Sequence, residues 1–332
     1  MLNDRRKEIL KIIVEEYIKT VKPVGSNSIC QALDCSSATV RNEMMYLEDN
    51  GLLEKTHTSS GRVPSEGGYR YYVNNLMEPQ NMTGEEMLKL QQIFHNNAVI
   101  MNDAIKKSIE LVSDITNYTA VVLGNNSLLN CLKKVETIPL DEGKILTMVI
   151  TDKGHVEYKT TVLPPNISKV DVKQTVDLIN KLLVGTPISE ISSKLEFEVK
   201  PIIGQYVKQY ESLYDAFYKA FSEISNKPTV DVQLMGRSHI LEQPEYNNVD
   251  KVKQLLYKLD DVKAISEMKE ENNGINIYIG KENQIDDDVA VVKTKYSYNG
   301  DEGTIAIIGP KRMNYAKVVG VLDFIKSNID NS

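Results

Sequence analysis

The sequence has few of the features that mark secreted or membrane proteins. It contains no tryptophan and three cysteines in 332 residues. Because this small, odd number of cysteines cannot form a full disulfide framework, we expect a cytoplasmic protein. No segment approaches the roughly 18 apolar residues that a transmembrane helix needs. The N-terminal residues mix both signs of charge into an apolar pattern, which is typical of neither a signal peptide nor a membrane anchor. We therefore expect no membrane partner.

An excess of positive charge is also missing. The chain has 39 basic and 46 acidic side chains, for a net charge of −7. Residues 1–77 hold ten of each sign, so the rest of the chain carries the whole negative charge. Non-specific affinity for nucleic acid depends mainly on neutralising phosphates. A neutral N-terminal segment would therefore bind DNA well only at a specific site, and only if two copies of the segment contact the DNA together.

The sequence lacks the usual signatures of an enzyme or a metal site. It has no glycine-rich cradle of the P-loop or dinucleotide kind. Its four histidines lie far apart, and Cys30 and Cys35 match no common zinc spacing, so we read these two cysteines as apolar fillers. Gly309–Arg312 could hold an anion, but a plain turn is favoured because Pro310 lacks an N–H donor. We expect no catalytic residues, no metal and no cofactor.

The first 77 residues show the order of elements of a winged helix-turn-helix. Apolar spacing predicts helices over 3–19, 26–33 and 36–49, with serine caps before the second and third helices. Leu52–Lys55, a polar tip and a second run that includes Tyr69–Val73 then predict a two-stranded hairpin. A three-helix packing or dimerisation module is the alternative that this pattern leaves open.

The outward side of the third predicted helix favours DNA binding. Its side chains are short polar groups and one planar fork, which can approach base edges and phosphates. The candidate residues of this helix are Ser36, Ser37, Thr39, Arg41 and Asn42. The hairpin adds hydroxyls and basic groups suited to phosphates or the minor groove. The candidate residues of the hairpin are Lys55, His57, Ser59, Ser60 and Arg62.

Three segments resemble one known family. They are PVGSNSI at 23–29, SSATVRNEMMYLEDNGLLEKTHTSSGRVPSEGGYRYYVNNLM at 36–77 and IIGPKRMNY at 307–315. On these motifs the chain resembles the heat-inducible transcription repressors called HrcA. The resemblance implies a homodimer that binds double-stranded DNA at an inverted-repeat operator of chaperone operons. It also implies dependence on a GroEL-type chaperonin and a GAF-like second domain interrupted by a dimerising insert.

The rest of the chain predicts mixed α and β structure. Strand-like runs with helices at both ends indicate an antiparallel α+β sheet, with 299–303 forming the turn of the last hairpin. With the resemblance, the fold class is an α+β multidomain protein. We expect a winged helix-turn-helix at 1–77, a linker and helix at 78–100, a GAF-like domain at 101–155 and 232–332, and a dimerising insert at 156–231. The polar residues 78–81 are the expected hinge.

A long predicted helix at about 200–225 is the candidate partner surface. Apolar residues recur there at heptad spacing, which suits a helix–helix seam. The candidate dimerisation residues are Ile203, Tyr206, Tyr210, Leu213, Phe217 and Phe221. Periodicity alone equally allows this helix to pack inside its own domain, and it is the resemblance that favours dimerisation.

The favoured function is therefore a DNA-binding repressor. In this hypothesis Arg41 contacts guanine or phosphate, and Asn42 contacts adenine or the DNA backbone. One rival is a GAF-type regulator that responds to a small molecule. Another is a scaffold that uses residues 1–77 for protein contact.

Overall fold

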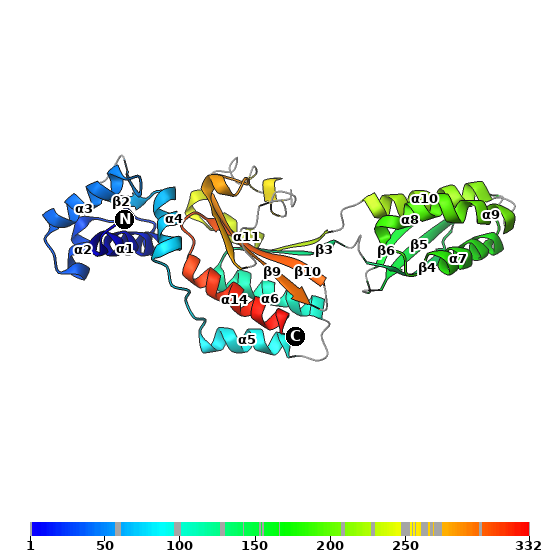
Figure 1. Cartoon of the computed structure of the whole chain (residues 1–332), viewed down its shortest axis with the longest axis horizontal. Helices are drawn as coiled ribbons and strands as arrows, with labels where there is room; N and C mark the ends of the chain where they lie inside the picture. Colours follow the sequence, from blue (N-terminus) through cyan, green and yellow to red (C-terminus); the bar gives the residue numbers. More distant parts are fainter. Residues whose placement is uncertain are drawn as a thin grey trace. The chain divides into compact units, whose positions relative to one another are not determined.

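The computed structural model shows two compact units (Figure 1). Unit 1 combines Met1–Gly124 with Val232–Ser332, and unit 2 is Asn125–Asp231. Among the helices that are described, none is long and apolar enough to cross a membrane. The described residues are 2–56, 61–95, 101–126, 130–141, 143–152, 154, 156–165, 167–206, 210–226, 230–246, 253, 255, 257–259, 265, 268, 274–298 and 301–331.

The N-terminal part of unit 1, residues 2–75, is called the head. It begins with the three predicted helices, α1 (Asp4–Thr20), α2 (Ser26–Leu33) and α3 (Ser37–Asp49). Helix α1 starts where the Asn3 side chain accepts a hydrogen bond from the Arg6 amide. Its buried stripe packs with the inner sides of α2 and α3. The stripe consists of Ile9, Leu10, Ile13 and Val14.

The wing is shorter than the sequence suggested. Strands β1 (Leu53–Lys55) and β2 (Arg62–Pro64) pair antiparallel, and Val24 pairs with Arg62 on the other side of β2. The prediction that Tyr69–Val73 form the second strand is wrong, because these residues lie in helix α4 (Glu66–Asn75). Ser65 caps α4 by accepting a hydrogen bond from the Gly68 amide. Tyr69 and Tyr72, three residues apart, then bury one side of the helix.

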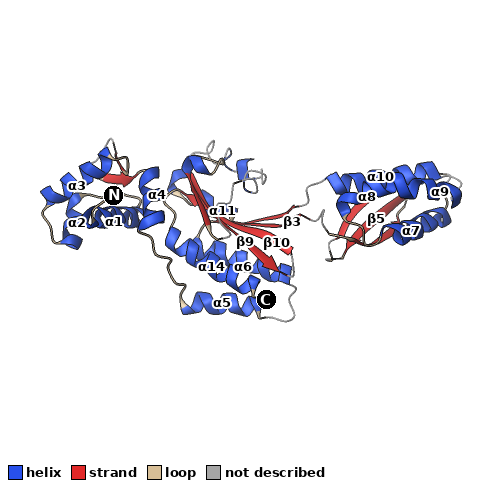
Figure 2. Cartoon of the chain, viewed as in Figure 1, coloured by secondary structure: helices blue, strands red, loops and turns tan. Residues whose placement is uncertain are grey.

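The rest of unit 1 is called the body, and it contains a five-stranded sheet in the order β7-β3-β10-β9-β8. The pairs β3–β10, β9–β10 and β8–β9 are antiparallel, so the predicted last hairpin is confirmed. A long C-terminal helix packs on β9, and two further long helices pack beside and beneath it (Figure 2). The strands are β3 (Thr119–Asn126), β7 (Val230–Met235), β8 (Asn276–Ile279), β9 (Val289–Tyr298) and β10 (Asp301–Pro310). The helices are α5 (Gly84–Phe94), α6 (Met101–Thr116) and α14 (Tyr315–Asp330), with the shorter α11 (Arg237–Leu241), η3 (Pro244–Tyr246) and η4 (Gly280–Glu282).

Unit 2 is a three-stranded antiparallel sheet with helices packed on one face. Its strands are β4 (Leu132–Pro139), β5 (Lys144–Thr151) and β6 (Val156–Val162). Its helices are α7 (Lys169–Leu183), α8 (Ile188–Lys194), η2 (Leu195–Val199), α9 (Lys200–Tyr206) and α10 (Tyr210–Asn226). The expected insert boundary at residue 156 needs correction. Because β5 pairs with β6 along its length, the second unit starts near residue 125.

The heptad stripe of the insert lies inside unit 2. Ile203, Leu213, Phe217 and Phe221 are all buried in one core with residues of α7, α8 and β5. This is the alternative that periodicity left open, in which the helix packs within its own domain. A side chain buried in this way has no surface left for a second chain, so these four are not assigned to a partner contact. The side chains of Tyr206 and Tyr210 lie outside the described part.

Candidate nucleic-acid interface

Helix α3 presents a polar side away from the head core. Its cap is Ser36, whose Oγ accepts a hydrogen bond from the Thr39 amide at 3.1 Å and lies 2.9 Å from Thr39 Oγ1. Val40, Met44 and Leu47 are buried and fix which side of the helix faces inward. Ser36, Arg41 and Asn42 are exposed, while Ser37 and Thr39 are half-buried. The structure therefore brings all five predicted helix residues to one end of α3 or its exposed side.

A small polar cluster holds the first turns of α2 and α3 together. Ser26 Oγ lies 2.9 Å from Ser37 Oγ, and the Ser37 hydroxyl donates to Asn27 Oδ1 at 3.3 Å. Arg41 Nε donates to Ser26 Oγ at 3.3 Å, so the exposed guanidinium is anchored at one of its three nitrogens. Sequence reasoning did not assign Ser26 and Asn27 to the site. Their only signal was their place in the first turn of the helix before the recognition helix.

Two of the three acidic side chains of α3 are paired within the head. Arg6 of α1 binds Glu43 at 2.7 Å and stacks over the Tyr46 ring, with its guanidinium carbon 3.4 Å from the centroid. Arg62 of β2 binds Glu48 at 2.7 Å. Both pairs draw carboxylates toward arginines, which reduces the repulsion that a phosphate would meet at this helix.

Arg62 lies on the wing as the sequence suggested, but its side chain is directed to α3. It was expected to contact DNA, but its side chain is only 12% exposed and also donates to the Gly61 carbonyl at 3.5 Å. It braces the wing against α3, and its contact with DNA stays a prediction. Lys55, opposite Arg62 in the β1–β2 register, is exposed. His57, Ser59 and Ser60 lie outside the described residues.

Comparison with known proteins agrees with this geometry. Residues 1–75 match the winged helix-turn-helix transcription repressor, HrcA DNA-binding family, and residues 102–319 match the HrcA protein C terminal domain family. The chain is 34% identical over its whole length to the heat-inducible transcription repressor HrcA of Bacillus pumilus, covering 98% of that protein. It is 36% identical over 99% of its length to the HrcA of Lysinibacillus sphaericus, covering 97% of that protein.

The chain belongs to the HrcA family of heat-inducible transcription repressors. It is therefore a DNA-binding repressor of heat-shock genes, and this family is not a class of enzymes. A crystal structure titled as that of a hypothetical protein matches the fold over 100% of this chain and 98% of its own, with a TM-score of 0.65 and 22% identity. That likeness concerns the fold alone.

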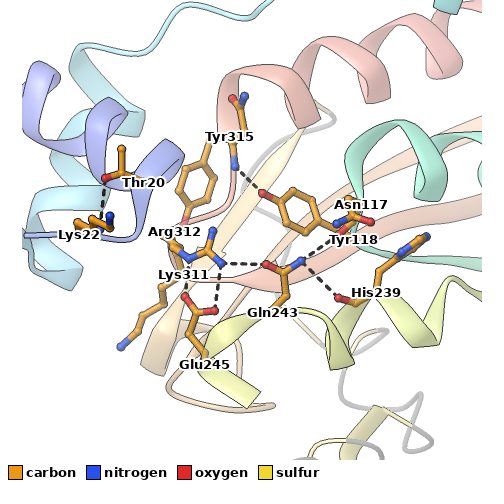
Figure 3. A network of polar contacts seen from close by, with 11 residues as sticks. Thr20, Lys22, Asn117, Tyr118, His239, Gln243, Glu245, Lys311, Arg312 and Tyr315 are labelled. Carbon is orange, nitrogen blue, oxygen red and sulfur yellow. Dashed lines mark hydrogen bonds and ion pairs between the residues drawn. The ribbon is translucent and has the colours of Figure 1, made fainter. Parts of the chain in front are cut away.

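The last HrcA-like motif, at 307–315, forms a buried polar network rather than an anion site (Figure 3). Arg312 Nη2 donates to Gln243 Oε1 at 2.9 Å and to Glu245 Oε2 at 3.1 Å. Gln243 Nε2 in turn donates to the carbonyls of Asn117 and His239, both at 3.3 Å. Because Glu245 already neutralises the Arg312 guanidinium, the geometry favours the plain turn over an anion cradle.

Proposed function

We propose that this HrcA-family chain represses transcription as a homodimer bound to an inverted-repeat operator, with α3 of each copy in a major groove. The observation that carries the proposal is the exposed polar side of α3, whose neighbouring acids are held by Arg6 and Arg62. A two-fold dimer requires an operator of matching symmetry. We also assign the body as the GAF-like domain that the resemblance implies, interrupted by unit 2.

Each exposed group of α3 has a role that suits its chemistry. Arg41 can make a bidentate contact to guanine or clamp a phosphate, and Asn42 can do the same with adenine or the DNA backbone. The hydroxyls of Ser36, Ser37 and Thr39 suit phosphates and fix the register of the helix. Lys55 on β1 adds one positive charge beside the DNA backbone.

Replacing Arg41 or Asn42 with alanine is expected to weaken DNA binding by about 1–3 kcal/mol each. The probe is a duplex that the wild-type protein selects from a random library, and binding is measured by fluorescence anisotropy at fixed salt. Arg41→Lys keeps the charge but not the fork, so it is expected to bind between wild type and Arg41→Ala. Lys107→Ala, at an exposed position of α6 in the body, removes the same charge and serves as the control. Unchanged binding by both alanine variants would contradict the groove assignment.

The homodimer is proposed to form through the face of the unit 2 sheet that lies opposite its helices. Alternate residues of β5, among them Ile145 and Val149, point to the helices and are buried. The opposite face, called the open face, carries apolar side chains that are partly or largely exposed. Its apolar members are Ile138, Leu146, Met148, Ile150, Val156, Tyr158 and Val162.

The polarity of β6 supports a second copy on the open face. Val156, Tyr158 and Val162 are 50%, 70% and 65% exposed, while the polar Glu157 and Lys159 between them are half-buried. An isolated sheet would present the reverse pattern, with its apolar residues against the helices. Two such faces can pack on each other about a two-fold axis, as the sheets of a sandwich do.

Dependence on a GroEL-type chaperonin is proposed on the same feature. A monomer would leave the apolar open face in water, and large exposed apolar patches mark sites of protein association. We expect protein that has lost DNA binding on mild heating to recover more binding with chaperonin and ATP than without them. The measurement is the fraction of active protein after cooling, titrated with labelled operator duplex. Equal recovery without chaperonin would remove this part of the proposal.

A further inference from the structure

The segment between the head and the body, expected to be a hinge, is held against α14. The Gln80 amide donates to the Ala316 carbonyl at 2.9 Å. Gly320, one helical turn further along α14, lies so close to the Gln80 carbonyl oxygen that a Cβ there would overlap it. Glu86, just after the segment, forms an ion pair with Lys317 at 3.2 Å. The connection therefore follows the surface of α14 in close contact.

Helix α4 ties the head to the sheet of the body. Arg70 donates from Nη2 to the Ile277 carbonyl at 2.7 Å and binds both carboxylate oxygens of Glu282. Tyr69 lies beside Tyr315 with ring centroids 6.2 Å apart, and both residues are buried. A bidentate arginine fixes orientation as well as distance, unlike a single point contact.

The third attachment is the apolar core that head and body share, against which Tyr17 of helix α1 packs. Burial raises the pKa of the Tyr17 phenol, and the nearby Glu245 carboxylate raises it further, while Arg312 opposes this effect. The buried apolar side chains of head and body belong to one connected core.

We propose that these three attachments, together called the joint, fix the direction of α3 relative to the body and so set the operator spacing that a dimer accepts. The inference rests on the proposed function, because spacing has meaning only for two heads on one duplex. Arg70, Glu282, Tyr315 and Gly320 are positioning residues in this view. The motif at 307–315 then serves the attachment of the head rather than a ligand.

The physical consequence is a narrow tolerance for spacer length. One added base pair moves a half-site by about 3.4 Å and rotates it by about 35°, since a turn holds 10–10.5 base pairs. A head held at a fixed angle to the body cannot turn by itself to follow that rotation, so the second contact is weakened and with it the advantage of tethering. A head released from the joint could turn to follow the groove.

The test compares spacer lengths selected by full-length wild type and by an Arg70→Ala/Gly320→Ala variant. Alanine favours helix more than glycine, so α14 itself is not weakened by the second change. Both proteins select duplexes from one random library, and affinities are then measured on one half-site pair with spacers altered by one base pair. Glu85→Gln, in an exposed ion pair of α5 with Lys89, is the matched control. The two single variants are selected in parallel, so a folding failure of the double variant still leaves a test.

We expect wild type and the control to enrich one spacer and to lose about tenfold in affinity when it changes by one base pair. We expect the joint variants to enrich the same half-site with several spacers and to lose no more than about threefold. The same single spacer for these variants, with the half-site retained, would overturn the inference while leaving the proposed function intact. A wild type that enriches no inverted repeat would overturn the proposed function, and the inference with it.

Discussion

The Tyr158→Glu/Val162→Glu variant is expected to be a monomer and to bind the inverted repeat about 10²–10⁴-fold more weakly than the wild-type dimer. Both side chains are largely exposed on the open face, so unit 2 should stay folded. Val162 lies opposite Lys144 in the β5–β6 register, which gives a new carboxylate a cross-strand partner. In a two-fold interface the two changes place four carboxylates in an apolar contact, where burying charge is strongly unfavourable.

Light scattering after size-exclusion chromatography measures the mass, and anisotropy measures DNA binding. Leu88→Glu provides the control, because Leu88 is a largely exposed apolar residue on α5 of the other unit. Binding is measured on two duplexes. Wild type and variant should bind a single half-site with equal affinity, whereas the variant should bind the inverted repeat more weakly. A variant that remains dimeric would place the interface away from the open face.

The head was predictable because its local signals agree with one another. Helical spacing placed the three helices within a few residues, and the structure confirms them. The serine cap expected for the third helix is confirmed at Ser36, whereas the one expected for the second is wrong, because Gly25 precedes that helix and no side chain caps it. Helix α4 was missed because its tyrosines and Val73 have high β propensity. The burial of Tyr69 and Tyr72 on one side of a helix, which depends on the body beneath it, outweighs that preference.

Arg62 shows what the sequence of the site could not reveal. Its place beside a polar wing tip is typical of a phosphate contact, and no local pattern indicates that Glu48 of α3 lies 2.7 Å away. Such pairing depends on how the wing folds back on the helix. By contrast, the exposure of Asn42 was predictable because helical periodicity places it opposite the buried Val40 and Met44, and Arg41 follows at the edge of that buried side.

Unit 2 limits the prediction in another way. Apolar periodicity tells which side of a helix avoids water, but not whether the covering atoms belong to the same chain or to a partner. The 203–221 stripe is covered by its own unit, whereas the open face of the sheet is not covered within the described residues. The alternation of apolar and polar residues along β6 did not predict this arrangement, because its apolar residues point away from the helices.

Phe217→Ala should therefore act on folding rather than on association. Phe217 is 1% exposed within the core of unit 2, so truncation leaves a cavity and is expected to destabilise this unit by about 3–5 kcal/mol. Because unit 2 is a compact unit of its own, we expect two transitions in chemical denaturation, of which only one moves. Phe217→Leu, which keeps most of the volume, should move that transition much less.

The dimer affinity gives the decisive comparison for the same residue. If Phe217 were an interface residue, its truncation would raise the dimer dissociation constant while the stability of a folded monomer stayed the same. The stability of the folded monomer can be measured in the Tyr158→Glu/Val162→Glu background, which has no dimer interface to lose. A denaturation midpoint that falls there by as much as in the dimer would establish that the stripe holds unit 2 together by itself.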